Sequence, residues 1–183
     1  MDGVNDSDAA LVGLAVAGDR AAFAALARRH YDMLFRVAWQ FTGDRGEAED
    51  VTQDVCVRLV KAIASWSREG RFETWAYRVV VNAVRDRQRS HAAERRKREA
   101  WAREPHVPAS DPDGDEAVAQ LWEAVRRLPP KQNEAVTLVH GQGASHAEAA
   151  AAMGCAETTV SYHIHEARKR LRVLMSETEE SDA

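Results

Sequence analysis

Several features are scarce in this chain of 183 residues, and each scarcity argues against a class of protein. The two cysteines, Cys56 and Cys155, have no CxxC partner, which indicates reduced thiols in a cytoplasm rather than a disulfide framework. No apolar run approaches the ~18 residues that a membrane-spanning helix needs, so we expect no membrane contact. No run of about four to eight residues alternates between apolar and polar, as a half-buried strand does. The chain is therefore expected to be all-α.

Groups that carry catalysis or bind metals are also scarce. No acid, base, nucleophile and metal-ligand set converges at a spacing typical of an active site, so we expect that the protein is not an enzyme and carries no cofactor. One set of residues deserves a test as zinc ligands: His140, His146, Cys155, His163 and His165. Their spacing matches no common zinc pattern, and surface histidines are the simpler interpretation.

Charge is unevenly distributed along the sequence. The formal net charge of −4 disfavours binding of nucleic acid over the whole surface. Residues 85–99, however, hold seven Arg and Lys against three Asp and Glu, a local net charge of +4. This segment is compatible with a local basic face, although a solvated helix end would have the same composition.

One break divides the chain into two halves. Residues 104–116, EPHVPASDPDGDE, contain three of the five prolines and no apolar period, which is typical of a flexible linker. On both sides apolar residues recur at three- and four-residue spacing, which predicts helices. We predict a first helical domain over 8–95, a linker over 96–116 and a second helical domain over 117–175.

The first half is predicted to be a four-helix packing. Its third expected helix runs from about residue 72 to 90, and the helix before it, within 47–66, places Val51, Val55, Leu59 and Ile63 on a buried stripe, with Cys56 and Val60 beside it. Asp50, Gln53 and Asp54 share another face, because positions i, i+3 and i+4 point the same way. From the residues alone, a solvated polar face is the simplest account of these three.

A concentration of aromatic rings and arginines lies between these helices. SWSREGRFETWAYR, residues 65–78, holds four of the twelve aromatics. Spacing places Trp75 in a helix core and leaves Tyr77 open, whereas Trp66 and Phe72 fall in or beside a loop broken by Gly70. Rings in such a loop are less easily explained by packing, so they are candidates for stacking on bases while arginines hold phosphates.

The second half has the outline of a helix-turn-helix. Leu121, Val125 and Leu128 form an apolar stripe that ends at two prolines. SHAE, residues 145–148, predicts a capping box at a helix start, and Gly154 supplies a turn. The helix that follows has its buried face at Val160, Ile164, Ala167, Leu171 and Leu174.

Taken together and in order, these segments resemble the extracytoplasmic-function (ECF) sigma factors of the bacterial sigma-70 family. TGDRGEAEDVTQDVCVRL resembles the part of region 2 that binds core RNA polymerase, and FETWAYRVVVNAVRD keeps the F-x-x-W-x-Y-R-x-x-x-N skeleton of the promoter-melting part. LPPKQNEAVTL and TTVSYHIHEARKRL resemble region 4, which binds the −35 element. The resemblance covers nearly all of residues 8–175.

The resemblance implies a role for each candidate residue. The face that would dock on the polymerase comprises Asp50, Gln53 and Asp54. The groups that would hold a flipped base of the −10 element or follow its phosphates are Trp66, Arg68, Arg71, Phe72, Arg78, Asn82, Arg85 and Arg89. The −35 contacts would come from Thr158, Thr159, Ser161, Tyr162, His163, His165, Glu166 and Arg168. The partners implied are core polymerase, promoter DNA and an anti-sigma factor.

The recognition helix departs from the family and leaves alternatives open. Ser161, His163 and Glu166 stand where many relatives carry Lys or Arg, which predicts weaker phosphate contact and an unusual −35 element. One alternative is a sigma-like decoy that sequesters an anti-sigma factor without binding DNA. Another is a plain helix-turn-helix regulator, which would leave the polymerase-like face and the melting loop unexplained.

Overall fold

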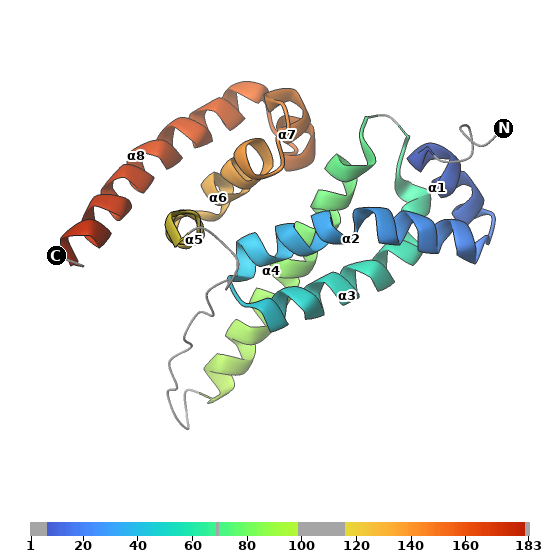
Figure 1. The fold of residues 1–183 in the computed structure, drawn as a ribbon, viewed down its shortest axis with the longest axis horizontal. Helices are drawn as coiled ribbons and strands as arrows, with labels where there is room; N and C mark the ends of the chain where they lie inside the picture. Colours follow the sequence, from blue (N-terminus) through green and yellow to red (C-terminus); the bar gives the residue numbers. More distant parts are fainter. Residues whose placement is uncertain (1–6, 69, 99–115, 182–183) are drawn as a thin grey trace. The chain divides into compact units, whose positions relative to one another are not determined.

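The computed structural model describes residues 7–68, 70–98 and 116–181, and every regular element within them is helical (Figure 1). The α-helices are α1 Asp8–Val16, α2 Arg20–Thr42, α3 Arg45–Ala62, α4 Phe72–Arg98, α5 Glu116–Arg126, α6 Pro130–Val136, α7 His146–Met153 and α8 Glu157–Ser181. A 3₁₀ turn at Ile63–Ser65 follows α3, and a π-helical segment at Thr137–Gly141 follows α6. The predicted all-α class is confirmed.

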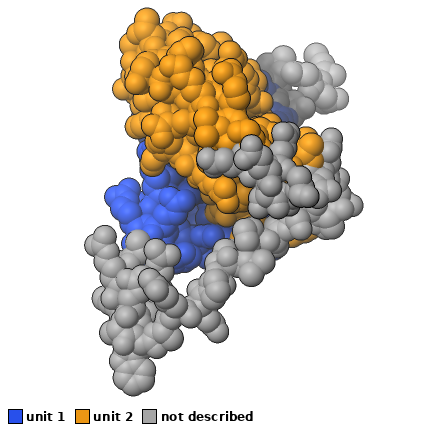
Figure 2. Space-filling view, turned by 90° about the vertical axis from the view of Figure 1, so that its left-hand side faces the viewer, with its two compact units in different colours: residues 1–38, 46–107 blue, residues 39–45, 108–183 orange. Residues whose placement is uncertain are grey.

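The chain divides into two compact units, shown in different colours in Figure 2. Residues 1–38 and 46–107 form unit 1, and residues 39–45 and 108–183 form unit 2. Most of the predicted linker, residues 99–115, lies outside the described residues. The described chain is helical up to Arg98, so α4 is longer than the expected helix over 72–90. Within the described ranges, no helix is long and apolar enough to cross a membrane.

Unit 1 has its core between α2, α3 and α4. The predicted stripe of α3 is buried, with Val51, Val55, Leu59 and Ile63 at most 3% exposed. The β-branched run of α4 is also buried, at Val80, Val81 and Val84, which confirms a buried helix rather than a strand. Of the two side chains beside the stripe, Cys56 is half-buried and Val60 is 58% exposed.

Two consecutive prolines mark the boundary between the first two helices after the linker, α5 and α6. α5 ends at Arg126, and α6 starts with Pro130 in its first position, where the missing N–H of proline costs no hydrogen bond. The side chain of Asn133 donates to the carbonyl of Val125 at 3.0 Å and so ties α6 to the end of α5. Leu121 was predicted to be buried with Val125 and Leu128, but it is exposed, so the apolar stripe of α5 is shorter than its spacing suggests.

The helix-turn-helix of unit 2 is set by local hydrogen bonds. The hydroxyl of Ser145 accepts from the backbone N–H of Glu148, whose carboxylate accepts from the backbone N–H of Ser145; this confirms the predicted capping box. Gly154 ends α7 at φ 64°, a left-handed conformation that glycine adopts without strain. Helix α8 then starts at Glu157. Its predicted buried face is fully buried at Val160, Ile164 and Ala167 and half-buried further on.

Candidate nucleic-acid interface

The exposed face of α3 combines acidic and apolar side chains. Asp50, Gln53 and Asp54 are all exposed, as the spacing predicted. Val57 continues the same face one turn later, and it is 65% exposed. Sequence reasoning missed Val57, although its i+3 distance from Asp54 places it on that face. An exposed valine beside two carboxylates is a surface suited to a protein partner with a basic and apolar patch.

An ion pair between helices holds this face in place. The Arg87 guanidinium of α4 lies 2.6 Å from the Asp50 carboxylate and 3.7 Å from that of Glu47, both on α3. A second pair joins Arg58 of α3 to Asp86 of α4 at 2.7 Å. Because Asp50 is the acidic residue tied to α4, its carboxylate is oriented before any partner arrives.

The aromatic rings beside the 66–71 loop belong to the core. Trp66 is 7% exposed and Phe72 is 2% exposed, and the two rings meet edge to face at 5.4 Å. Phe72 also lies 4.8 Å from the His30 ring and 5.4 Å from the Trp75 ring, between ring centroids. The expectation that Trp66 and Phe72 escape packing was wrong. The loop turns both rings inward, and burying two large apolar side chains there is favourable.

Arginines form the outer side of this loop. Arg68 and Arg71 are both exposed, and Arg68 has the positive φ of 62°, which a non-glycine residue adopts only at some cost. Arg71 lies 3.5 Å from the Glu73 carboxylate. The buried Nε1–H of Trp66 donates no hydrogen bond to any described residue. Arg68 and Arg71 therefore give the loop an exposed cationic surface, and the rings of Trp66 and Phe72 lie buried beneath it.

A polar stripe runs along α4 after the loop. Arg78, Asn82 and Arg89 are exposed and Arg85 is half-buried, at the predicted positions i, i+4, i+11 and i+7. The question left open for Tyr77 is settled, since this side chain is 2% exposed. The spacing of the stripe along one helix face suits successive phosphates of a nucleic-acid strand.

The candidate −35 contacts lie in the first half of α8. Four are exposed and point away from the buried face, namely Thr158, Ser161, Tyr162 and His165; Arg168 is exposed one turn further on. Thr159, His163 and Glu166 are half-buried. Tyr162 is 60% exposed, with its ring 5.6 Å from that of His163.

Two of these polar side chains are already engaged. Ser161 Oγ lies 3.0 Å from Nδ1 of His146 on α7, a contact that links the two helices of the motif. The Lys169 ammonium donates to the Glu166 carboxylate at 3.0 Å, and this hydrogen bond lowers the pKa of Glu166. Burial lowers the pKa of His140, and the neighbouring Arg168 and His146 lower it further. The exposed groups in the first half of α8 are therefore mainly hydroxyl, imidazole and phenol groups, and the cations begin at Arg168.

The histidines of unit 2 do not make a metal site within the described residues. No three of His140, His146, Cys155, His163 and His165 bring ligand atoms together with one another or with nearby carboxylates. Nδ1 of His163 is buried and has no hydrogen-bond partner among the described residues.

Both units match known sequence patterns. Residues 26–94 match "Sigma-70 region 2" and residues 119–171 match "Sigma-70, region 4". These matches define the class: a sigma-70-type factor, a class of non-enzymatic proteins that start transcription. SigM of Mycobacterium tuberculosis strain H37Rv, described as an ECF RNA polymerase sigma factor, is 36% identical over 176 residues, which cover 92% of this chain and 85% of SigM. The chain belongs to the ECF family of RNA polymerase sigma factors.

Other relatives agree in sequence or in fold. SigE of Mycolicibacterium smegmatis, also described as an ECF sigma factor, is 33% identical over 165 residues. That alignment covers 85% of this chain but only 63% of SigE, so this chain spans less than two thirds of that relative. The solved structure of CnrH, in complex with the cytosolic domain of CnrY, matches with a TM-score of 0.68 and 26% identity over 91% of this chain and 95% of CnrH.

Proposed function

We propose that this sigma factor directs core RNA polymerase to specific promoters and begins to separate the DNA strands there. The observation that carries the proposal is the surface of unit 1, where an acidic and apolar face on α3 and an arginine stripe on α4 occur in the segment that matches region 2. The first fits a protein partner and the second fits a nucleic-acid backbone. The polymerase performs the synthesis, and this chain supplies the choice of start site.

Core polymerase binds, in this proposal, to the face formed by Asp50, Gln53, Asp54 and Val57. The carboxylates pair with basic groups of the polymerase, and Val57 fills an apolar contact at the centre. The ion pair with Arg87 holds the Asp50 carboxylate in place in the free chain. The face therefore offers a partner both charged groups and one small apolar side chain.

The proposal is tested by combining Asp50→Arg with Asp54→Arg. We expect the affinity for core polymerase to fall at least about tenfold, because like charges then face each other across the interface. Run-off transcription from promoters of the same genome should fall in parallel. Asp32→Arg, another exposed acidic position in unit 1, is the matched control and should leave both measurements unchanged. Retained binding in the double variant would remove the α3 face from the proposal.

Promoter opening is assigned to the 66–71 loop and the α4 stripe. Arg68 and Arg71 would hold phosphates at the edge of the melted strand, and the stripe from Arg78 to Arg89 would follow the backbone. Trp66 and Phe72 are buried beneath the loop. They would support the loop in place and would not stack on a flipped base themselves. Unstacking a base costs a few kcal/mol, which contacts of this loop would offset.

The −35 element is read, in this proposal, by the first half of α8. Thr158, Ser161, Tyr162, His165 and Arg168 face outward from the half of the motif that usually enters the major groove. Hydroxyl and imidazole groups in place of Lys and Arg predict modest affinity with a shallow salt dependence. Core binding without initiation, in the same run-off assay, would favour a sigma-like decoy.

A protein that covers these surfaces would block the binding of polymerase and DNA and so regulate the sigma factor. CnrH was solved with the cytosolic domain of CnrY bound to it, and this chain covers nearly all of CnrH. We propose an anti-sigma factor as a partner of unit 1 and unit 2 here. Because polymerase and chromosomal DNA are cytoplasmic, we place this activity in the cytoplasm.

A further inference from the structure

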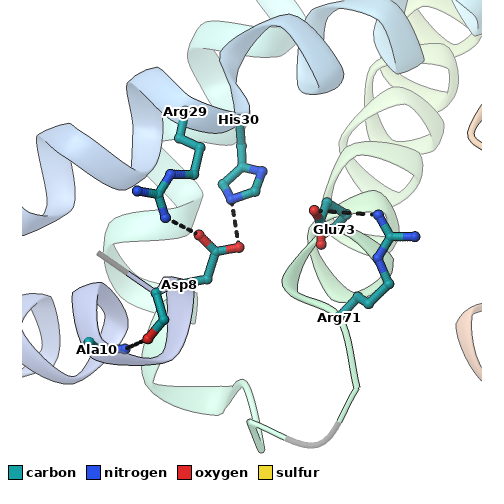
Figure 3. Close-up of polar contacts among 7 residues, drawn as sticks. Asp8, Ala10, Arg29, His30, Arg71 and Glu73 are labelled. Carbon is teal, nitrogen blue, oxygen red and sulfur yellow. Dashed lines mark hydrogen bonds and ion pairs between the residues drawn. The ribbon is translucent and has the colours of Figure 1, made fainter. Parts of the chain in front are cut away.

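Three potential metal ligands converge in unit 1, namely Asp8, His30 and Glu73 (Figure 3). Asp8 is the first residue of α1, His30 lies in the middle of α2 and Glu73 lies in the first turn of α4. One ligand atom of each lies within 4.8 Å of the other two. The His30 side chain is only 7% exposed, whereas the Asp8 side chain is 21% exposed and that of Glu73 36%. The cluster therefore combines a buried imidazole with two partly exposed carboxylates.

Arginines outside the cluster contact one oxygen of each carboxylate, and an ion would replace the proton shared between Asp8 and His30. Asp8 Oδ2 lies 2.9 Å from Nε2 of His30, while Oδ1 of the same carboxylate accepts from Arg29 at 2.8 Å. Oε1 of Glu73 lies 3.5 Å from Arg71. Protein metal sites commonly hold their carboxylate ligands through such second partners. Arg29 and Arg71 can keep these contacts while Asp8 Oδ2 and Glu73 Oε2 bind the ion.

Electrostatics favour a cation at the centre of the three side chains. Two carboxylates approach the same imidazole, and their like charges repel each other at short range. The two arginines are 33% and 56% exposed, so water screens much of their effect. A divalent ion between Asp8, His30 and Glu73 would remove the repulsion directly.

We propose that Asp8, His30 and Glu73 form a site for a divalent transition-metal ion of the Zn²⁺ type. One imidazole nitrogen and two carboxylate oxygens are a ligand set that Zn²⁺ accepts, with water completing the tetrahedron. The 2.9 Å separation of Nε2 and Oδ2 suits two ligands on one ion, and Glu73 reaches the ion by a change of rotamer because its side chain is partly exposed. Ca²⁺ and Mg²⁺ fit less well, because both prefer sites made of oxygen alone.

Metal binding at this position would tie together the three helices α1, α2 and α4. Glu73 follows the 66–71 loop directly, and Phe72, between them, packs its ring on His30. An ion would therefore fix the start of α4 and with it the base of the loop. The proposal concerns metal binding itself and does not depend on the activity proposed above.

The test uses the full chain stripped of metal, with Co²⁺ as an optical probe and Zn²⁺ in calorimetric titration. We expect one Zn²⁺ per chain, ligand-field absorption from Co²⁺ that Zn²⁺ displaces, and a rise of the unfolding temperature with Zn²⁺. Glu73→Gln and His30→Gln should each weaken Zn²⁺ binding by about a hundredfold or more, since each removes a direct ligand. Glu73→Gln is the decisive variant, because its partly exposed side chain can change without loss of the core.

A matched control separates this site from the histidines of unit 2. His146→Gln should leave Zn²⁺ affinity and the Co²⁺ spectrum unchanged. No bound Zn²⁺ in the wild-type chain at millimolar concentration would overturn the proposal and leave the cluster a hydrogen-bonded tie between helices. Binding that survives Glu73→Gln and His30→Gln but is lost in His146→Gln would overturn it too. Neither result decides the proposed role in transcription, because both experiments measure metal binding alone.

Discussion

Replacing Phe72 by alanine tests whether the ring beside the 66–71 loop is a core residue or a surface for DNA bases. The side chain is 2% exposed and its ring meets those of His30, Trp66 and Trp75. Replacing a buried phenylalanine by alanine costs about 3–5 kcal/mol, from lost transfer free energy and the cavity left behind. We take about 4 kcal/mol for Phe72→Ala, since three ring contacts are lost together.

Hydrogen exchange measures this change in the full chain, segment by segment. About 4 kcal/mol corresponds to roughly a thousandfold drop in protection, at 1.36 kcal/mol for each factor of ten. The most protected amides of α2, α3 and α4 should show this drop in protection. Protection of peptides from α7 and α8, which belong to unit 2, should not change. Arg71→Ala is the matched control, because its exposed side chain should contribute within about 0.5 kcal/mol. Unchanged protection in Phe72→Ala would refute the core assignment.

A conservative variant then separates packing from stacking on a base. Phe72→Leu keeps an apolar side chain in the core but removes the aromatic face. We expect promoter opening, followed by permanganate footprinting with core polymerase, to survive this change. Loss of opening with normal hydrogen exchange in unit 1 would instead show that the aromatic face itself acts on the DNA.

Three further predictions concern other parts of the chain. Val57→Asp should change the free energy of unfolding by less than about 0.5 kcal/mol, since the side chain is exposed, yet weaken binding to core polymerase in a pull-down titration. Ser145→Ala should lower the stability of unit 2 by about 1 kcal/mol in urea unfolding, because it removes the capping box; an unchanged midpoint would contradict the cap. Lys169→Met should return the lowered pKa of Glu166 toward its ordinary value in an NMR titration. Because that pKa is lowered in the folded chain, the pair stabilises the fold above the ordinary glutamate pKa and loses this effect as pH falls through the lowered one.

Much of the fold could be predicted from the sequence because its signals are local. The stripe from Val51 to Ile63 needs only the helical period, and the Ser145–Glu148 cap needs residues three positions apart. The left-handed turn at Gly154 depends on the absence of one side chain. The acidic face of α3 was predicted correctly for the same reason, since neighbours on a helix surface are set by spacing alone.

Exposure beside these stripes was harder to predict. Val60 and Leu121 are apolar and close to the right period, but both are exposed. How wide a strip of a helix is covered depends on the helices that pack against it, and apolar spacing does not give this width. Val57 was missed because an exposed valine on a binding face resembles an ordinary helix residue when only the sequence is in view.

By itself, the sequence determined the helices, their caps, the helix-turn-helix and the likeness to ECF sigma factors, all of which depend on residues close together in the chain or on patterns in fixed order. Only the tertiary structure decided that Trp66 and Phe72 are buried, that Asp50 pairs with Arg87, and that Asp8, His30 and Glu73 meet. These features depend on contacts between different helices rather than between neighbours on one helix. They depend on how the helices cross, and that is set by the packing of all their side chains together.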